Sequence, residues 1–321
     1  LVAVWLCWPA LTSVGGALGT TRCMFGTSGV SAIRLVCTRL APHLTGSAPA
    51  SVQPVLFLTM AAASGADAAA AAAATPDVDA ESIAAALAEV KGKIDAAVAK
   101  AAHPPVRPPR LVAVSKTKPL AAIAAAHAAG QRRFGENYVQ ELVGKANDVD
   151  VPAGIEWHFI GTLQSNKAKV VAAVPGLAMV ETVTSEKVAK LLQKAVASGP
   201  RPDPLAVMVQ VNTSGEENKG GVEPDKCAAL VASIKNNCPN LTLAGLMTIG
   251  QYGRVTGPGE VNPDFELLVK VKQEVCTELE LDPAEMELSM GMSGDYEHAI
   301  DLGSTNVRVG STIFGARSKK P

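Results

Sequence analysis

Short apolar stretches recur along residues 111–309, and longer stretches with mixed apolar and polar positions separate them. Apolar runs that are rich in branched side chains are typical of strands buried on both faces of a sheet. Eight strands are predicted in this way, and they cover residues 111–115, 133–135, 157–160, 179–183, 205–211, 243–248, 286–289 and 306–309.

The segments between these strands have the spacing and the end signals of helices. Pro119 and Gly130 frame one of them, because proline is tolerated at a helix start and glycine is favoured just past its end. Helices are predicted over residues 82–102, 119–129, 138–146, 167–173, 185–197, 224–235, 263–279 and 296–302.

Strict alternation of strands and helices predicts an α/β protein with a parallel sheet. Eight such units over about 240 residues fit a (β/α)8 TIM barrel. The alternative is an open doubly wound sheet, but the sequence lacks the GxGxxG fingerprint that would favour it. We therefore expect residues 81–321 to form the barrel and residues 1–80 to form a leader with an alanine-rich linker.

The leader has an unusual composition. Residues 1–66 contain no Asp or Glu, and they contain three arginines among many Ser, Thr and Ala residues. This pattern predicts a transit peptide to a chloroplast or mitochondrion. The alternative is that translation starts at Met60, so that residues 1–59 have no role and the protein is cytoplasmic.

Charge and cysteine content narrow the possible partners. The net charge is -1 and only 18% of residues are charged, so nothing indicates nucleic acid as a partner. The apolar start of the chain is far too short to cross a membrane. The six cysteines form no CxxC pair and no zinc-site spacing, so we expect them to be reduced and mostly buried or incidental.

Lys116 directly follows the first predicted strand. Function in a TIM barrel lies at the carboxyl ends of the strands. A lysine whose stem is desolvated there has a lowered pKa, which frees the amine to attack a carbonyl. Lys118 is the rival, but it precedes Pro119 and should be extended in the loop. Pyridoxal phosphate is the obvious biological carbonyl compound for such a lysine.

The loops after the last two strands offer a phosphate site. Gly310 lets the backbone approach an anion, and Ser311 adds an N–H group and a hydroxyl. Ser289 ends the seventh strand, with Gly291 and Ser293 beyond it. Either loop alone could be a plain turn. Together, opposite a lysine, they favour a phosphate.

Six motifs occur in order along the chain, and the first of them holds Lys116. They are residues 114–119 (VSKTKP), 133–141 (RFGENYVQE), 156–167 (EWHFIGTLQSNK), 245–249 (GLMTI), 288–293 (LSMGMS) and 307–317 (VRVGSTIFGAR). Together they resemble the pyridoxal phosphate homeostasis protein family, also called the proline synthase co-transcribed homologue family, whose barrel is similar to the N-terminal domain of alanine racemase. The resemblance covers roughly residues 82–318.

The resemblance implies roles for several of these residues. It assigns a Schiff base with pyridoxal phosphate to Lys116, and it places Arg308 against the pyridine nitrogen. Arginine keeps its proton, so it leaves that nitrogen unprotonated and the ring a poor electron sink. Asn137 could hydrogen-bond the ring oxygen. Lys219 occupies a lysine position that could bind a second, transferable cofactor molecule, although a solvated loop lysine is the simpler interpretation.

Other positions are ambiguous or unusual. His158 and Met247 are expected to be core residues more often than cofactor contacts. Residues 251–262 are rich in Gly and Pro and predict a surface loop near the barrel mouth. The run after Ser293 keeps Asp295, but it departs from the family's usual residues at three positions, so the lip of the site should differ. These positions are Gly294, Tyr296 and His298.

Two functions follow from the resemblance. One is a carrier that buffers pyridoxal phosphate and delivers it to apo-enzymes; the other is an amino-acid racemase or lyase. Racemases of this type add a β-rich domain that supplies a tyrosine base and a dimer interface. The sequence ends at Pro321, which leaves no room for it, so we expect a monomeric carrier without catalytic residues and without metal.

Overall fold

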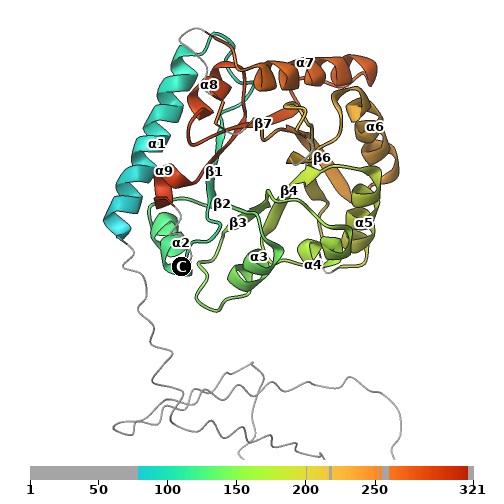
Figure 1. The fold of residues 1–321 in the computed structure, drawn as a ribbon. Helices are drawn as coiled ribbons and strands as arrows, with labels where there is room; N and C mark the ends of the chain where they lie inside the picture. The colour runs from blue at the N-terminus through green and yellow to red at the C-terminus, as the bar shows by residue number, and fades with distance from the viewer. Residues whose placement is uncertain (1–78, 200, 217–218, 252, 255–259, 317–321) are drawn as a thin grey trace, which may run out of the picture. The chain divides into compact units, whose positions relative to one another are not determined.

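The computed structural model describes residues 79–199, 201–216, 219–251, 253–254 and 260–316. Almost all of the predicted leader, including its three cysteines, lies outside these residues. The described part contains eight parallel strands that close into a barrel in chain order (Figure 1). The strands are β1 (Arg110–Val114), β2 (Arg133–Glu136), β3 (Glu156–Phe159), β4 (Leu177–Val183), β5 (Leu205–Gln210), β6 (Leu241–Met247), β7 (Glu287–Met292) and β8 (Asn306–Val309).

Helices surround this barrel and alternate with its strands (Figure 1). They are α1 (Ala80–Lys100), α2 (Leu120–Ala128), α3 (Val139–Ala146), α4 (Ala168–Ala172), α5 (Glu186–Ala197), α6 (Cys227–Asn237), α7 (Pro263–Glu278), α8 (Tyr296–Asp301) and α9 (Ser311–Phe314). The TIM-barrel prediction is confirmed. The open-sheet alternative is wrong, because β1 pairs with both β2 and β8.

The differences from the predicted elements are local. The helix predicted from residue 167 is preceded by a 3-10 turn over Ser165–Lys167, and the one predicted from residue 224 begins as a 3-10 turn over Pro224–Lys226. Strand β7 runs three residues further than expected, to Met292. The four-residue helix α9 was not predicted, because one turn is too short to show a helical period.

Helix α1 takes the place of the helix that would follow the last strand. The helix after β8 is only the single turn α9, and α1 lies beside α2, α8 and α9 in the outer ring (Figure 1). Asp79 caps its start by accepting a hydrogen bond from the N–H of Ser82 at 3.1 Å. Ile83, Leu87 and Val90 form its buried stripe. The N-terminal helix therefore covers the seam where β8 meets β1.

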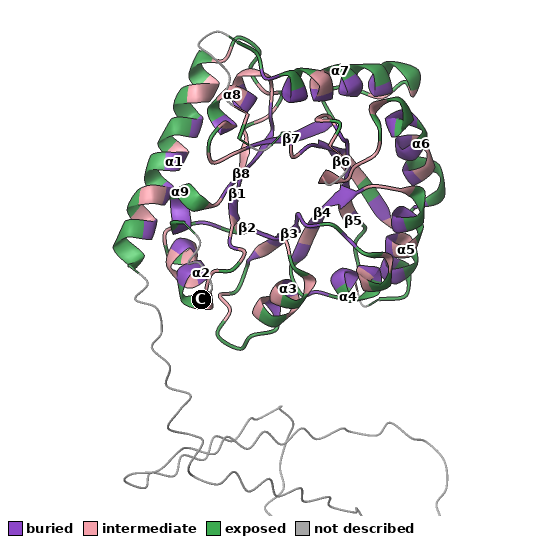
Figure 2. Cartoon of the chain, in the orientation of Figure 1, coloured by how far each residue is buried: buried purple, intermediate pink, exposed green. Residues whose placement is uncertain are grey.

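Each strand contributes to two separate cores, since successive side chains point to opposite faces. Outward side chains such as Phe134 and Trp157 pack under the helices, with ring centroids 6.0 Å apart. Inside the barrel, Met179, Met208 and Met247 form a small apolar cluster. The strands are therefore buried along most of their length (Figure 2).

Ion pairs lie at the amino ends of the strands. Arg110 Nη1 is 2.8 Å from Glu287 Oε2, and Arg133 Nε is 2.8 Å from Glu156 Oε2. Arg133 and Glu156 are both exposed to solvent over nearly half of their side chains. Their ion pair therefore contributes little to stability. Charged side chains at the amino ends of these strands therefore pair with one another.

The described cysteines behave as expected. Cys227, Cys238 and Cys276 are buried and unbonded, and burial raises the pKa of the Cys227 thiol to about 12. Within the described ranges, no cluster of three or more His, Cys, Asp or Glu side chains could hold a metal ion. No helix among those residues is both long and apolar enough to span a bilayer.

Gly245 shows how closely two strands approach each other. A Cβ atom built on Gly245 would lie 2.1 Å from the backbone oxygen of Glu287 and 2.7 Å from its nitrogen. No side chain can relieve such an overlap, because the obstacle is the backbone of β7. Glycine in the 245–249 motif is therefore required by the packing of β6 against β7.

We expect Gly245→Ala to destabilise the barrel by about 1–3 kcal/mol, because β6 and β7 must separate to admit the methyl group. Urea unfolding followed by circular dichroism measures this. The matched control is Gly92→Ala in α1, where an added Cβ meets nothing within 4 Å. That control should be neutral or stabilising by about 0.5–1 kcal/mol. Equal effects in the two variants would contradict the packing argument.

Candidate functional site

Lys116 lies at the carboxyl end of β1, as predicted. Strand β1 ends at Val114, and Ser115 continues the ladder by donating its N–H to the carbonyl of Gly135 at 3.0 Å. The N–H of Lys118 then donates to the carbonyl of Ser115 at 3.0 Å, which closes a turn around Lys116. Lys116 is half-buried. Its backbone therefore has a defined place at the barrel rim.

Lys118 has a structural role that sequence reasoning did not foresee. Its Nζ atom donates to the carbonyl of Phe314 at 2.6 Å and to that of Ala316 at 3.0 Å. These are carbonyls at the end of α9, where a cation is favourable. Burial lowers the pKa of Lys118. The ammonium group nevertheless has two carbonyl partners, which argues against Lys118 as the nucleophile.

The carboxyl end of β8 lies next to that of β1. Val112 pairs with Arg308 and Ala113 with Val309, and a Cβ on Gly310 would lie 3.2 Å from the carbonyl oxygen of Val114. Strand pairing therefore brings Arg308 and Gly310 to the rim that carries Lys116.

Helix α9 begins immediately after Gly310. Ser311 is its first residue and is exposed. In the first turn of a helix, the N–H groups have no acceptor within the helix. The N–H of Gly310 donates to Ser293 Oγ at 3.1 Å, so this loop is tied to the one after β7. The two loops predicted to share a phosphate are therefore in contact.

The side chain of Arg308 is buried and held on both sides. Its Nη2 atom donates to the carbonyl of Thr248 at 2.7 Å, and Nη1 donates to Ser289 Oγ. Glu181 on β4 is the counter-charge, with Oε2 4.0 Å from Arg308 Nη1. The guanidinium group thus has a fixed orientation inside the barrel.

Ser289 is fully engaged in this interior network. Its hydroxyl donates to Glu181 Oε2 at 2.6 Å and accepts from Asn306 Nδ2 at 2.9 Å and from Arg308. One donated and two accepted bonds use the full capacity of a hydroxyl. Ser289 was predicted as a cofactor contact. Its described partners are protein groups, so any contact with a ligand would have to replace one of them.

Glu181 is the centre of the network, and sequence reasoning missed it. His158 Nδ1 is 2.6 Å from Glu181 Oε1, and Asn306 Nδ2 donates to the same oxygen at 3.0 Å. Burial by itself raises the pKa of Glu181. The hydrogen bond and charge of His158, the charge of Arg308 and the Ser289 hydroxyl outweigh burial and lower the pKa to about 2. Glu181 is therefore a buried carboxylate.

Asn137 follows β2 at the same rim. Its side-chain oxygen is buried, and no hydrogen-bond partner for it exists among the described residues. An orphaned acceptor of this kind is costly unless a ligand or water satisfies it. A Cβ on Gly161 would lie 1.9 Å from the Asn137 carbonyl oxygen, so the glycine of the third motif allows Asn137 its position.

The two expected core residues are buried in the barrel. His158 contacts Glu181, and Met247 packs with Met179 and Met208. Lys219 lies over the end of β5, where its carbonyl accepts from Gln210 Nε2 at 3.0 Å. Its predicted role as a second cofactor site stays a prediction. The 251–262 loop is described only in part.

The run after Ser293 keeps Asp295 and departs from the family pattern at Tyr296 and His298, among others, and the structure shows what these three residues do. The Asp295 carboxylate accepts from the N–H of Met292 at 2.6 Å, so the loop after β7 keeps its shape. Tyr296 is buried, and burial raises its pKa. His298 Nε2 accepts from the N–H of Asn262 at 3.0 Å, which joins α8 to the residue before α7.

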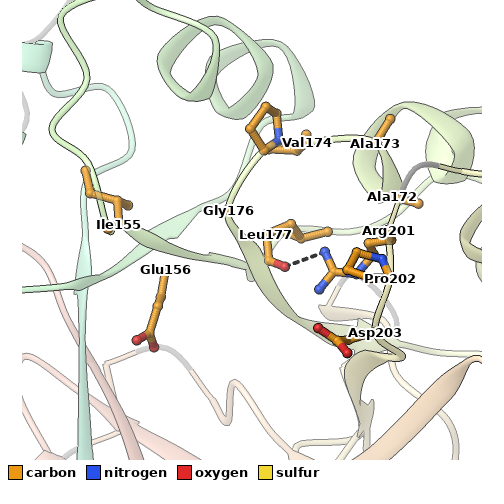
Figure 3. Close-up of a pocket in the computed structure, with 12 residues that line it drawn as sticks. Ile155, Glu156, Ala172, Ala173, Val174, Gly176, Leu177, Arg201, Pro202 and Asp203 are labelled. Carbon is orange, nitrogen blue, oxygen red and sulfur yellow. Dashed lines mark hydrogen bonds between the residues drawn. The ribbon is translucent and has the colours of Figure 1, made fainter. Parts of the chain in front are cut away.

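A cavity of about 640 Å³ lies at the other end of the barrel (Figure 3). It is lined by residues at the starts of β3 and β4, including Glu156 and Leu177, and by Arg201. Arg201 Nη1 donates to the carbonyl of Leu177 at 2.7 Å. Since parallel strands all start at one rim and end at the other, this cavity is separate from the site around Lys116.

Comparison with known proteins agrees with this geometry. The family model "Alanine racemase, N-terminal domain" matches residues 93–318. The human pyridoxal phosphate homeostasis protein is 48% identical over 245 residues, which cover 74% of this chain and 89% of the relative. The protein of the same name from Vibrio cholerae is 45% identical over 212 residues, with 65% and 85% covered.

Solved structures of similar fold include a member of the same family and a racemase. PipY of Synechococcus elongatus PCC7942, solved with PLP bound, is 32% identical, with a TM-score of 0.58; the match covers 73% of this chain and all of PipY. An alanine racemase from Corynebacterium glutamicum, 15% identical, matches with a TM-score of 0.52 over 74% of this chain and 62% of its own, which shows the fold alone. The chain therefore belongs to the pyridoxal phosphate homeostasis protein family, whose barrel is that of the alanine racemase N-terminal domain.

Proposed function

We propose that this chain binds pyridoxal phosphate at the carboxyl end of the barrel. The Lys116 amine would condense with the aldehyde, with loss of water, to form a Schiff base. The observation that carries this proposal is the meeting of three groups at one rim. These are the lysine after β1, the oriented arginine on β8 and the helix start at Ser311. PLP bound to the relative PipY supports the choice of ligand.

The phosphate would lie at the start of α9. The N–H groups of Ser311 and Thr312 belong to the first helical turn, and the Ser311 hydroxyl is exposed. Such N–H groups and the positive end of the helix dipole favour an anion. Packing also favours glycine at position 310, because a Cβ atom there would lie 3.2 Å from the carbonyl oxygen of Val114.

The ring would lie between Arg308 and Asn137. An arginine cannot give up its proton, so a ring nitrogen that faces it stays unprotonated and withdraws electrons weakly. Such a ring stabilises a carbanion only weakly. The orphaned side-chain oxygen of Asn137 marks a polar position that a ligand could satisfy.

The role that fits these features is a monomeric carrier that holds pyridoxal phosphate and delivers it to apo-enzymes. Relatives at 45–50% identity are named for pyridoxal phosphate homeostasis, which supports a carrier over a racemase. Assays of amino-acid racemisation with the loaded protein test this directly, since catalytic turnover would identify an enzyme.

We expect Lys116→Ala to abolish the visible absorbance of bound pyridoxal phosphate and leave the fold intact, because the amine of the neighbouring Lys118 is bound to the carbonyls of Phe314 and Ala316. The measurement is an absorption spectrum, then borohydride reduction and peptide mapping. The matched control is Lys190→Ala, on the exposed face of α5, which should label as the wild type does. Reduction of the cofactor onto a different lysine in the wild type would refute the assignment.

We expect Glu181→Gln to lower the free energy of unfolding by about 3 kcal/mol at pH 7, since it leaves the buried Arg308 without its counter-charge. The folded-state pKa of Glu181, about 2, lies below that of an unfolded glutamate. The stability that the carboxylate contributes is therefore complete above about pH 5 and is lost as the pH falls toward 2.

Urea unfolding between pH 7 and pH 3 measures this difference. The gap between wild type and Glu181→Gln should narrow as the pH falls below about 5. Glu186→Gln, on exposed α5, is the control and should change stability by less than about 0.5 kcal/mol. A gap that stays constant down to pH 3 would show that the charge of Glu181 is not the source of stability.

A further inference from the structure

The residues on either side of Lys116 are held by charged side chains from β2 and α3. Lys145 Nζ donates to the carbonyl of Ser115 at 2.9 Å. The Ser115 hydroxyl donates to Glu136 Oε1 at 2.6 Å, and the N–H of Thr117 donates to Glu141 Oε2 at 2.7 Å. We refer to Glu136, Glu141 and Lys145 as the carboxylate–lysine cluster.

Thr117 has a backbone conformation that needs such support. Its φ is 63°, in the left-handed region, although threonine is β-branched. This conformation costs about 1–2 kcal/mol for an L-residue other than glycine. A hydrogen bond from its N–H to a charged carboxylate is of the strong class and offsets that cost. Glu141 therefore stabilises a strained turn directly after Lys116.

Lys145 links Glu136, which binds Ser115, to Glu141, which binds Thr117. Besides the Ser115 carbonyl, its ammonium group donates to Glu136 Oε1 at 2.7 Å and to Glu141 Oε2 at 3.1 Å. Three acceptors match the three hydrogens of an ammonium group. Its side chain is only 12% exposed and that of Glu136 is fully buried, so water does not screen the cluster as it screens an exposed pair.

Removal of Lys145 would leave two neighbouring carboxylates without their shared cation. Burial raises the pKa of Glu136, and Lys145 opposes that shift through its charge and hydrogen bond. Without the cation, Glu136 and Glu141 would repel each other or take up protons. Either response weakens their bonds to Ser115 and Thr117, which flank the lysine.

We propose that Lys145 is a positioning residue that fixes the backbone of Lys116 for its reaction with the aldehyde. Lys145 acts on Ser115 directly and on Thr117 through Glu141. The inference deepens the proposed function and rests on it for the ligand, but the ordering of the turn is a property of the chain alone. Preorganisation of this kind raises affinity, because the reacting group loses less freedom on binding.

The test compares full-length wild type, Lys145→Met and Lys190→Met. Lys190 is the matched control because it also pairs with a glutamate four residues away, but on an exposed helix face. The first readout is amide hydrogen exchange at residues 115–118 without pyridoxal phosphate. We expect Lys145→Met to speed exchange there by about tenfold or more, and Lys190→Met to leave it within about twofold.

The second readout is titration with pyridoxal phosphate, followed by borohydride trapping and peptide mapping. We expect Lys145→Met to raise the Kd by about tenfold or more, with the trapped ligand still on Lys116. If this variant fails to fold, Glu141→Ala carries the test, since its side chain is 31% exposed and its loss frees the Thr117 N–H.

A variant that loses stability but keeps wild-type exchange at the turn and wild-type Kd would overturn the proposal, because Lys145 would then only support the fold. A wild type that binds no pyridoxal phosphate would overturn the proposed function instead. In that case the exchange rates alone decide whether Lys145 orders the turn.

Discussion

Closure of the parallel sheet is the constraint on which the rest of the molecule depends. The pairing of β1 with β8 sets Val112 beside Arg308, so two distant parts of the chain share one rim. Lys118 fastens the same seam by binding the carbonyls at the end of α9, and α1 covers it from outside. The candidate site therefore lies at this seam. The relative positions of Lys116 and Arg308 depend on the pairing of β1 with β8.

The barrel interior combines two kinds of packing. Three methionines fill the side formed by β4, β5 and β6, where shape alone is needed. Around Glu181, hydrogen bonds from His158, Ser289 and Asn306 and the charge of Arg308 satisfy one carboxylate. Arg308 is in turn held by Ser289 and by the carbonyl of Thr248. Burial of a charge is tolerated because every partner is present. Arg308 is thus held in place by buried groups of the protein itself.

Much of the fold could be predicted from the sequence, because the period of apolar positions is a local property. The eight strands and the place of Lys116 followed from that pattern and are confirmed. Glu181 was missed, although a carboxylate inside the apolar stretch 179–183 is itself a signal of a buried ionic partner. The partner, Arg308, is known only once β4 and β8 face each other across the barrel.

The carboxylate–lysine cluster beside Lys116 could not be predicted from the sequence either. Glu141 and Lys145 are four residues apart on α3, a spacing that normally indicates an exposed surface pair. Only the packing of α3 against the end of β1 brings their charges to the backbone of Ser115 and Thr117. Similarly, α9 is one turn long, and its role depends on its neighbours rather than on any pattern of its own.

The seam also has a consequence for the order of events during synthesis. Lys118 and Phe314, which meet across it, are 196 residues apart. At roughly 5–20 residues per second, a ribosome needs roughly 10–40 s to make the stretch between them. During that time β1 has no β8 to pair with, and Lys116 emerges long before Arg308 exists. In the nascent chain, Lys116 is therefore present before the strand that pairs with β1 has been made. The carboxyl-end rim of the barrel is among the last parts of the protein to form.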